Sequence, residues 1–274
     1  MRNPIRPRIW APILLCCSLL SFTLPFAYGA DKADKREIIA RARQAYYSLR
    51  SRGLAEFTVS VQPNWRLVLK EQLAADPAAA EKALTMLNGI HFLVSLGPDG
   101  AVKITHREEV APINQKAAEG FSQIFSGMEQ AMSGFFDSWS PFMLTSPFPE
   151  IGGEYSLEEV GNQYHLSYKD GSAAIATTMS KKDLMISEIK VDSSEFKSVL
   201  SPHFSNSAQG FLLTGYEATY QGAAGGAEVQ LNVRIENQPA SAMQLPHKLN
   251  LDGSYQGTPF QMELMFSDYQ VKKH

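Results

Sequence analysis

Val229-Gln230-Leu231-Asn232-Val233-Arg234-Ile235 alternates apolar and polar side chains at every step. Because successive side chains of a β-strand point to opposite faces, this run predicts a strand with one dry face and one wet face. Strands that are joined by short turns pair in antiparallel fashion, so the C-terminal half is predicted to be one antiparallel sheet. Similar runs, separated by short turns, lie on both sides of the quoted one, at 164–168, 173–179, 184–191, 211–220, 248–255 and 260–271.

The N-terminal half mixes helical and strand patterns, which together with the sheet predict the α+β class. Asp76 followed by Pro77 is typical of a helix cap and the first helical position. The sequence Gly97-Pro98-Asp99-Gly100 is typical of a turn between two paired strands. The elements expected here are a helix over 33–52, a strand over 55–61, a helix over 76–87 and a hairpin over 91–105.

Residues 112–139 predict a long amphipathic helix. At 100° per residue its large apolar side chains fall within an arc of about 120°. Gly120, Gly127 and Gly134 lie at heptad spacing on one flank of this arc. Three interior glycines cost a helix about 3 kcal/mol relative to alanine, so we expect close approach of a neighbouring backbone, or mobility, to account for them. The candidate ligand-binding residues form the apolar stripe of this helix: Phe121, Phe125, Met128, Met132, Phe135, Phe136 and Trp139.

Two interpretations of the apolar stripe remain open. In the first, the helix packs on the concave face of the sheet as part of a filled core. In the second, the stripe lines or covers a cavity for an apolar ligand. Residues 121–148 hold six Phe, one Trp and three Met, and methionine adapts its shape to flexible ligands. Burial of an acyl chain yields about 0.8 kcal/mol per methylene, so a lipid site needs apolar volume and no catalytic groups.

Residues 1–29 have the three parts of a secretory signal peptide. Arg2, Arg6 and Arg8 precede an apolar run, and Ala27-Tyr28-Gly29 offers small residues before a cut. A single transmembrane anchor is the alternative, but prolines interrupt the apolar run. Leu15 before Cys16 and Cys16 before Cys17 do not provide the small residue that precedes a lipidated cysteine. We therefore expect an exported, periplasmic protein with no stable membrane anchor.

Removal of this segment changes the charge and cysteine content of the mature protein. The segment contains three arginines and none of the 28 acidic residues, so its removal changes the formal net charge from −3 to −6. An acidic protein is a poor candidate for nucleic acid or anionic lipid surfaces. Both cysteines leave as well, which excludes disulfides, thiolate nucleophiles and cysteine metal sites from the mature chain. An apolar core must then hold residues 30–274 together as a single domain.

The mature chain lacks the common local signatures of hydrolase, zinc-protease and nucleotide sites. Its six histidines are scattered, and adjacent acids such as Glu158 and Glu159 point to opposite faces of a strand. We therefore predict no catalytic residues, no metal and no cofactor. An enzyme of unknown reaction remains an alternative, which would require acids or histidines distant in sequence, for example Glu108, His165 or Glu263, to converge.

Residues 38–61 read as an amphipathic helix followed by a strand, with Tyr46, Tyr47 and Leu49 before the strand, and residues 245–251 and 262–271 read as two closing strands. These two ends of the mature chain resemble the first helix and strand and the last two strands of the periplasmic lipoprotein carriers of the LolA and LolB type. The resemblance covers residues 62–150 poorly. Because LolB-like receptors are lipidated and this chain has no suitable cysteine, the resemblance favours a soluble carrier or sensor.

This resemblance implies a strongly curved antiparallel sheet, that is, a half-open β-barrel, with helices on its concave side. It further implies a cavity that sequesters a lipid or lipoprotein acyl chain, exchanged with donor and acceptor proteins at membranes. The same fold also hosts sensors and at least one enzyme, so the fold alone does not decide the function. The alternative to a carrier is a periplasmic sensor or interaction protein with a filled core.

Overall fold

The computed structural model describes residues 29–108 and 115–274 of the 274-residue chain. The predicted signal peptide lies outside these residues, apart from Gly29, and so does the predicted start of the long helix at residue 112. In the described part, one antiparallel sheet of twelve strands carries most of the structure, together with a few helices. The predicted α+β class with a large antiparallel sheet is confirmed.

The strand order of the sheet is β3-β2-β1-β12-β11-β10-β9-β8-β7-β6-β5-β4. Every pair but one joins strands that are consecutive in the chain. The exception brings the two ends of the domain together, because Leu54 of β1 lies opposite Lys273 of β12. The strands are β1 Leu54–Pro63, β2 Ile90–Leu96, β3 Val102–Glu108, β4 Tyr155–Val160, β5 Gln163–Asp170, β6 Ala173–Ser180, β7 Ile186–Asp192, β8 Phe196–Ser207, β9 Gly210–Gly222, β10 Glu228–Ala240, β11 Met243–Tyr255 and β12 Thr258–Lys273.

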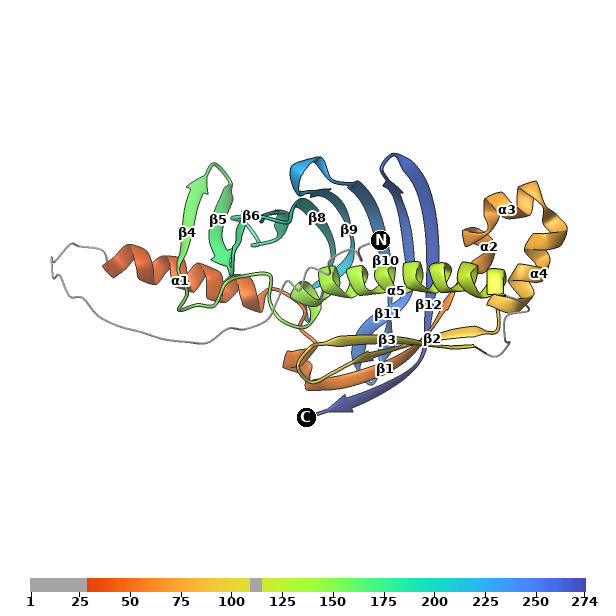
Figure 1. The fold of residues 1–274 in the computed structure, drawn as a ribbon. Coiled ribbons are helices and arrows are strands. Elements are labelled where there is room, and N and C mark those ends of the chain that lie inside the picture. Colours follow the sequence, from red (N-terminus) through yellow and green to blue (C-terminus); the bar gives the residue numbers. More distant parts are fainter. Residues whose placement is uncertain (1–28, 109–114) are drawn as a thin grey trace.

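The helices gather on one face and at the ends of this sheet. Figure 1 shows α5 crossing the sheet, α2 to α4 grouped beyond one end of α5, and α1 near strands β4 to β6 at the other end. The helices are α1 Gly29–Gln44, α2 Trp65–Val68, α3 Lys70–Ala75, α4 Pro77–Leu87 and α5 Gln115–Met143, with two 3-10 turns, Arg50–Arg52 and Ala223–Gly225.

Several local predictions are confirmed at the residues that carried them. Asp76 caps α4, because its carboxylate accepts a hydrogen bond from the backbone N–H of Ala79 at 3.1 Å. The carboxylate of Asp99 accepts from the N–H of Ala101 at 3.0 Å and so closes the turn of the β2–β3 hairpin. Strand β8 has no strict alternation and was not predicted.

The predicted helix over 33–52 is wrong in its second half. α1 ends at Gln44, and Tyr46 instead forms a parallel bridge to Phe211 of β9. Tertiary contacts override the helical pattern here. Tyr46 and Tyr47 are buried, the N–H of Tyr47 donates to the carbonyl of Phe211, and the N–H of Phe211 donates to the carbonyl of Ala45. A short 3-10 turn, Arg50–Arg52, then leads into β1.

Register irregularities interrupt the ladders of the long strands. The β1–β12 pair contains two shifts, near Leu54 and Thr58, and the β8–β9 and β10–β11 pairs contain one each, near His203 and Glu236. An extra residue on one strand bends that strand and increases its twist. These shifts therefore allow long strands to curve around the buried face of α5.

Candidate functional site

The apolar stripe of α5 is buried against the sheet. Phe121 is half-buried, and the other six predicted site residues are at most 4% exposed: Phe125, Met128, Met132, Phe135, Phe136 and Trp139. Phe136 packs against Phe57 of β1 and Phe266 of β12, with ring centroids 6.4 and 6.3 Å apart. Burial of each such side chain contributes about 1.5–3 kcal/mol. The stripe is thus a main contributor to the core, and its side chains occupy the space between α5 and these strands.

The two flanks of α5 touch different parts of the sheet. On one flank, Glu129 Oε1 lies 3.0 Å from His106 Nδ1 of β3, and the His106 ring packs against Phe125. On the opposite flank, Ser138 Oγ lies 3.1 Å from the hydroxyl of Tyr220 of β9. These two polar contacts fix how α5 is turned about its own axis.

The three glycines of α5 reach no neighbour. Gly120, Gly127 and Gly134 are exposed, and a Cβ atom built on any of them would meet nothing within 4 Å. The expectation that a close backbone approach explains them is therefore wrong, because no backbone approaches them. What they still do is lower the intrinsic stability of α5, by about 1 kcal/mol each. The other expected explanation, mobility of the helix, remains a prediction.

An apolar surface that is only partly buried continues across the sheet beside α5. Directly paired residues of neighbouring antiparallel strands share a face. One such row crosses β7 to β12 through Ile189, Leu200, Ala218, Leu231, Gly253 and Phe260. We call the partly exposed apolar members of this face next to α5 the apolar wall. The apolar wall consists of Val229, Leu231, Tyr255, Phe260 and Met262.

The apolar wall is tightly packed at Gly253 and open at one end. At Gly253 a Cβ atom would lie 2.9 Å from the Phe260 ring and 3.0 Å from a Leu231 methyl group, so these two side chains close over bare backbone. At the open end, Tyr255 is 52% exposed. Large apolar side chains that remain accessible on an inward-facing surface are typical of a site that receives an apolar partner.

A cluster of hydroxyl groups lies between α5 and the apolar wall. Tyr216 and Tyr220 are four residues apart on the same face of β9, and Ser138 of α5 interacts with both hydroxyls. Burial raises the pKa of both phenols above the usual value, and Asp137 adds a smaller increase to both, while the hydrogen bond to Ser138 partly opposes it. Asp137 is exposed, yet partial desolvation by surrounding atoms also raises the pKa of its carboxyl. The two phenols are therefore neutral hydrogen-bond donors at physiological pH.

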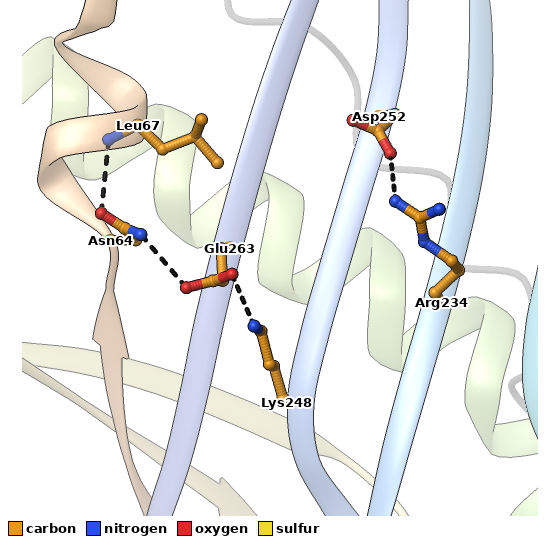
Figure 2. A network of polar contacts seen from close by, with 6 residues as sticks. All are labelled: Asn64, Leu67, Arg234, Lys248, Asp252 and Glu263. Carbon is orange, nitrogen blue, oxygen red and sulfur yellow. Dashed lines mark hydrogen bonds and ion pairs between the residues drawn. The ribbon is translucent and has the colours of Figure 1, made fainter.

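The opposite face of the sheet is polar and tied together by charge. Figure 2 shows Glu263 of β12 between Asn64, which precedes α2, and Lys248 of β11, with Arg234 and Asp252 paired beside them. The hydrogen bond to Lys248 lowers the pKa of Glu263, and its counterpart raises the pKa of Lys248. A depression of about 600 Å³ on this face is lined mainly by Ser201, Glu217, Thr219, Gln230, Asn232, Asp252 and Ser254. These interactions anchor α2 and join neighbouring strands.

The residues considered for an enzyme do not gather in one place. His165 lies on β5 and Glu263 on β12, seven strands apart, which is about 33 Å along the sheet at the usual strand spacing. Glu108 ends β3, beyond β12 in the strand order, and its side chain lies outside the described residues. Among the side chains that the structure describes, no group of three His, Cys, Asp or Glu could hold a metal ion.

Comparisons with protein-family models, with curated proteins and with solved structures give no match for this chain. Within residues 29–108 and 115–274, no helix has both the length and the apolar character needed to cross a membrane.

The sequence predicts the stripe of α5, but it does not predict the apolar wall or the hydroxyl cluster. Alternation along the strand predicts that Leu231 faces the core. Its place in the apolar row across β7 to β12 depends on the register of every strand pair, which the sequence does not show. Ser138 was not distinguished from other serines of α5. The spacing of Tyr216 and Tyr220, four residues apart in a strand, was the one available signal, since it places both on the same face.

Proposed function

We propose that this protein is an exported, soluble carrier that sequesters a lipid or lipoprotein acyl chain between α5 and the concave side of a half-open barrel. The observation that carries the proposal is the unusual make-up of α5. One face supplies large apolar side chains to the core, while glycines that touch nothing weaken the helix itself. Such a helix can bend or unwind at low conformational cost, and a ligand that covers its apolar face would offset the packing lost from the sheet.

The apolar wall supports the same proposal. Displacement of α5 would join the buried side chains of the stripe to the already accessible surface around Leu231, Tyr255 and Phe260. An acyl chain of 16 carbons buried on such a surface gains roughly 12 kcal/mol, which is enough to offset the exposure of several core side chains. Binding then requires apolar volume alone, and no catalytic group, metal or cofactor takes part.

The proposed location and the proposed exchange of the ligand between membranes are based on the predicted signal peptide and the acidic mature chain. An exported protein without an anchor would take its ligand from one membrane-associated donor and release it to another acceptor. The protein would bind neither nucleic acid nor anionic membrane surfaces by charge, since its mature net charge is negative.

The test is to purify the protein from the periplasm of its own cells and analyse it by native mass spectrometry and lipid extraction. The proposal predicts bound lipid that dissociates on denaturation. A folded protein that carries no lipid and takes up no acyl-chain probe would contradict the proposal.

A tether on α5 provides a sharper version of this test. The mature chain is predicted to hold no cysteine, so His106→Cys with Glu129→Cys places two unique thiols on facing sides of β3 and α5. A short thiol-reactive cross-linker should hold α5 on the sheet and abolish uptake of an acyl-chain probe. Each single cysteine variant, treated in the same way, should take up the probe as the unmodified protein does.

The alternative is a sensor or interaction protein in which the stripe only fills the core. Met132 is fully buried, as a filled core requires. Substitution of Met132 or Phe125 by a charged residue distinguishes the carrier from the protein with a filled core. A folded variant that has lost uptake supports the carrier, whereas outright unfolding supports the filled core.

A further inference from the structure

The polar groups next to the apolar wall differ in kind from those elsewhere on the sheet. The outer face carries ion pairs, such as Lys248 with Glu263. The inner face beside α5 carries the hydroxyls of Ser138, Tyr216 and Tyr220, with Tyr216 only 1% exposed. An apolar surface that ends in buried hydroxyls is suited to a molecule with an apolar body and an uncharged polar end.

Register places the hydroxyl cluster at the edge of the apolar wall. Tyr220 lies directly opposite Val229 of β10, and Val229 lies opposite Tyr255 of β11. Tyr216 and Tyr220 flank Ala218, whose partner on β10 is Leu231. A chain that lies along the wall toward β9 therefore reaches the tyrosine hydroxyls without leaving the inner face of the sheet.

The charge around the cluster selects against anions. The Asp137 carboxylate acts on both Tyr216 and Tyr220 and raises the pKa of each phenol. A phosphate or carboxylate placed here would be repelled by the Asp137 carboxylate. A carbonyl or hydroxyl group would meet donors and no repulsion.

Hydrogen bonds can be exchanged at this cluster without loss. With α5 in place, the Ser138 hydroxyl and the Tyr220 hydroxyl satisfy one another at 3.1 Å. When a ligand takes the place of α5 on this face, it covers both tyrosines, and each buried O–H then needs an acceptor. A ligand carbonyl can accept from both, so it replaces Ser138 as the partner of the tyrosines.

We propose that Tyr216 and Tyr220, with Ser138 as their partner in the empty protein, bind the uncharged polar end of the ligand, so that the protein takes neutral acyl esters in preference to anionic lipids. The proposal rests on the proposed function, because it assigns the ligand class of the same site. It predicts an ester or alcohol head group at the hydroxyl cluster and the acyl chain along the apolar wall.

The test uses displacement of a fluorescent acyl-chain dye from the purified mature protein by mono-oleoylglycerol, by oleate and by dioleoyl-phosphatidylglycerol. We expect mono-oleoylglycerol to bind best. The double variant Tyr216→Phe with Tyr220→Phe should lower the affinity for mono-oleoylglycerol, measured relative to the affinity for the dye, by about ten-fold, the equivalent of one or two lost hydrogen bonds. Tyr164→Phe, a half-buried tyrosine of β5 outside the cluster, is the matched control.

Asp137→Asn provides a second variant that keeps the buried tyrosines intact. Since Asp137 is exposed, the substitution should leave the fold unchanged, and it should raise the affinity for oleate by removal of a like charge. If all three lipids bind equally, and neither the phenylalanine nor the asparagine variant changes their order, the assignment of the hydroxyl cluster is overturned while acyl-chain binding stands. If neither the dye nor any of the three lipids binds, the proposed function itself fails.

Discussion

The hydroxyl of Tyr46 accepts a hydrogen bond from the backbone N–H of Ile186 at 2.7 Å. It also donates to the carbonyl of Leu184 at 3.1 Å, and thereby satisfies both backbone groups at the start of β7. The ring meanwhile packs edge-on against Phe148, Phe204 and Phe211. One side chain therefore joins the segment after α1 to three other parts of the domain.

Tyr46→Phe should destabilise the fold by about 1–3 kcal/mol. The ring contacts would remain, but the N–H of Ile186 and the carbonyl of Leu184 would be left buried without a partner. Urea unfolding followed by circular dichroism measures the change. Tyr255→Phe is the control, because a tyrosine that is 52% exposed should change the free energy of unfolding by less than about 0.5 kcal/mol. Equal effects of both variants would contradict the role given to Tyr46.

The free energy of unfolding should fall steeply as the pH rises above about 10. Burial raises the pKa of five tyrosines above 10.0, so above about pH 10 the unfolded chain loses protons that the folded chain keeps. The stabilisation that these tyrosines provide is therefore fully present below about pH 10. It is lost as the pH rises, by up to about 1.4 kcal/mol per pH unit for each tyrosine. The five are Tyr46, Tyr168, Tyr216, Tyr220 and Tyr269.

Denaturant unfolding between pH 9 and 11.5, with tyrosinate absorbance followed in parallel, measures this dependence. Tyr269→Phe removes one of the five phenols and should make the slope shallower by about 1.4 kcal/mol per pH unit. A slope that does not change would mean that Tyr269 ionises with its ordinary pKa in the folded protein.

Phe136→Ala should cost about 3–5 kcal/mol of stability, because the side chain is fully buried between β1 and β12. Phe121→Ala, at the half-buried start of the stripe, should cost clearly less. Thermal unfolding of both variants gives the comparison. Similar small losses at both positions would show that α5 spends much of its time away from the sheet in solution.

Much of this fold is encoded in local patterns, and the exceptions share one cause. Alternation predicts the strands around Val233, and the Asp76-Pro77 pair predicts α4, since both signals act within a few residues. The pairing of β1 with β12 joins Leu54 to Lys273, and no local pattern specifies it. The end of α1 was missed because Tyr46 gains more from distant partners than from another helical turn. The hydroxyl cluster was missed for the same reason, as it forms only after α5 and β9 meet.

Replacement of Gly120, Gly127 and Gly134 together by alanine should stabilise the protein by about 2–3 kcal/mol. Each position is helical, exposed and free of neighbours within 4 Å, so a methyl group removes backbone entropy without a clash. Urea unfolding measures the gain, and hydrogen exchange of the α5 amides should slow in parallel. Gly161→Ala is the contrasting control, since its φ of 58° makes alanine unfavourable there.

The glycine variant also separates a mobile α5 from a static one. If α5 must leave the sheet for a ligand to enter, stabilising the helix should slow both uptake and release of an acyl-chain probe while the fold becomes more stable. Stopped-flow fluorescence with the same dye gives both rates. If the variant is more stable but exchanges the dye at unchanged rates, movement of α5 does not contribute to the barrier for uptake and release. The helix would then stay in place during binding. The apolar wall alone would in that case have to hold the chain.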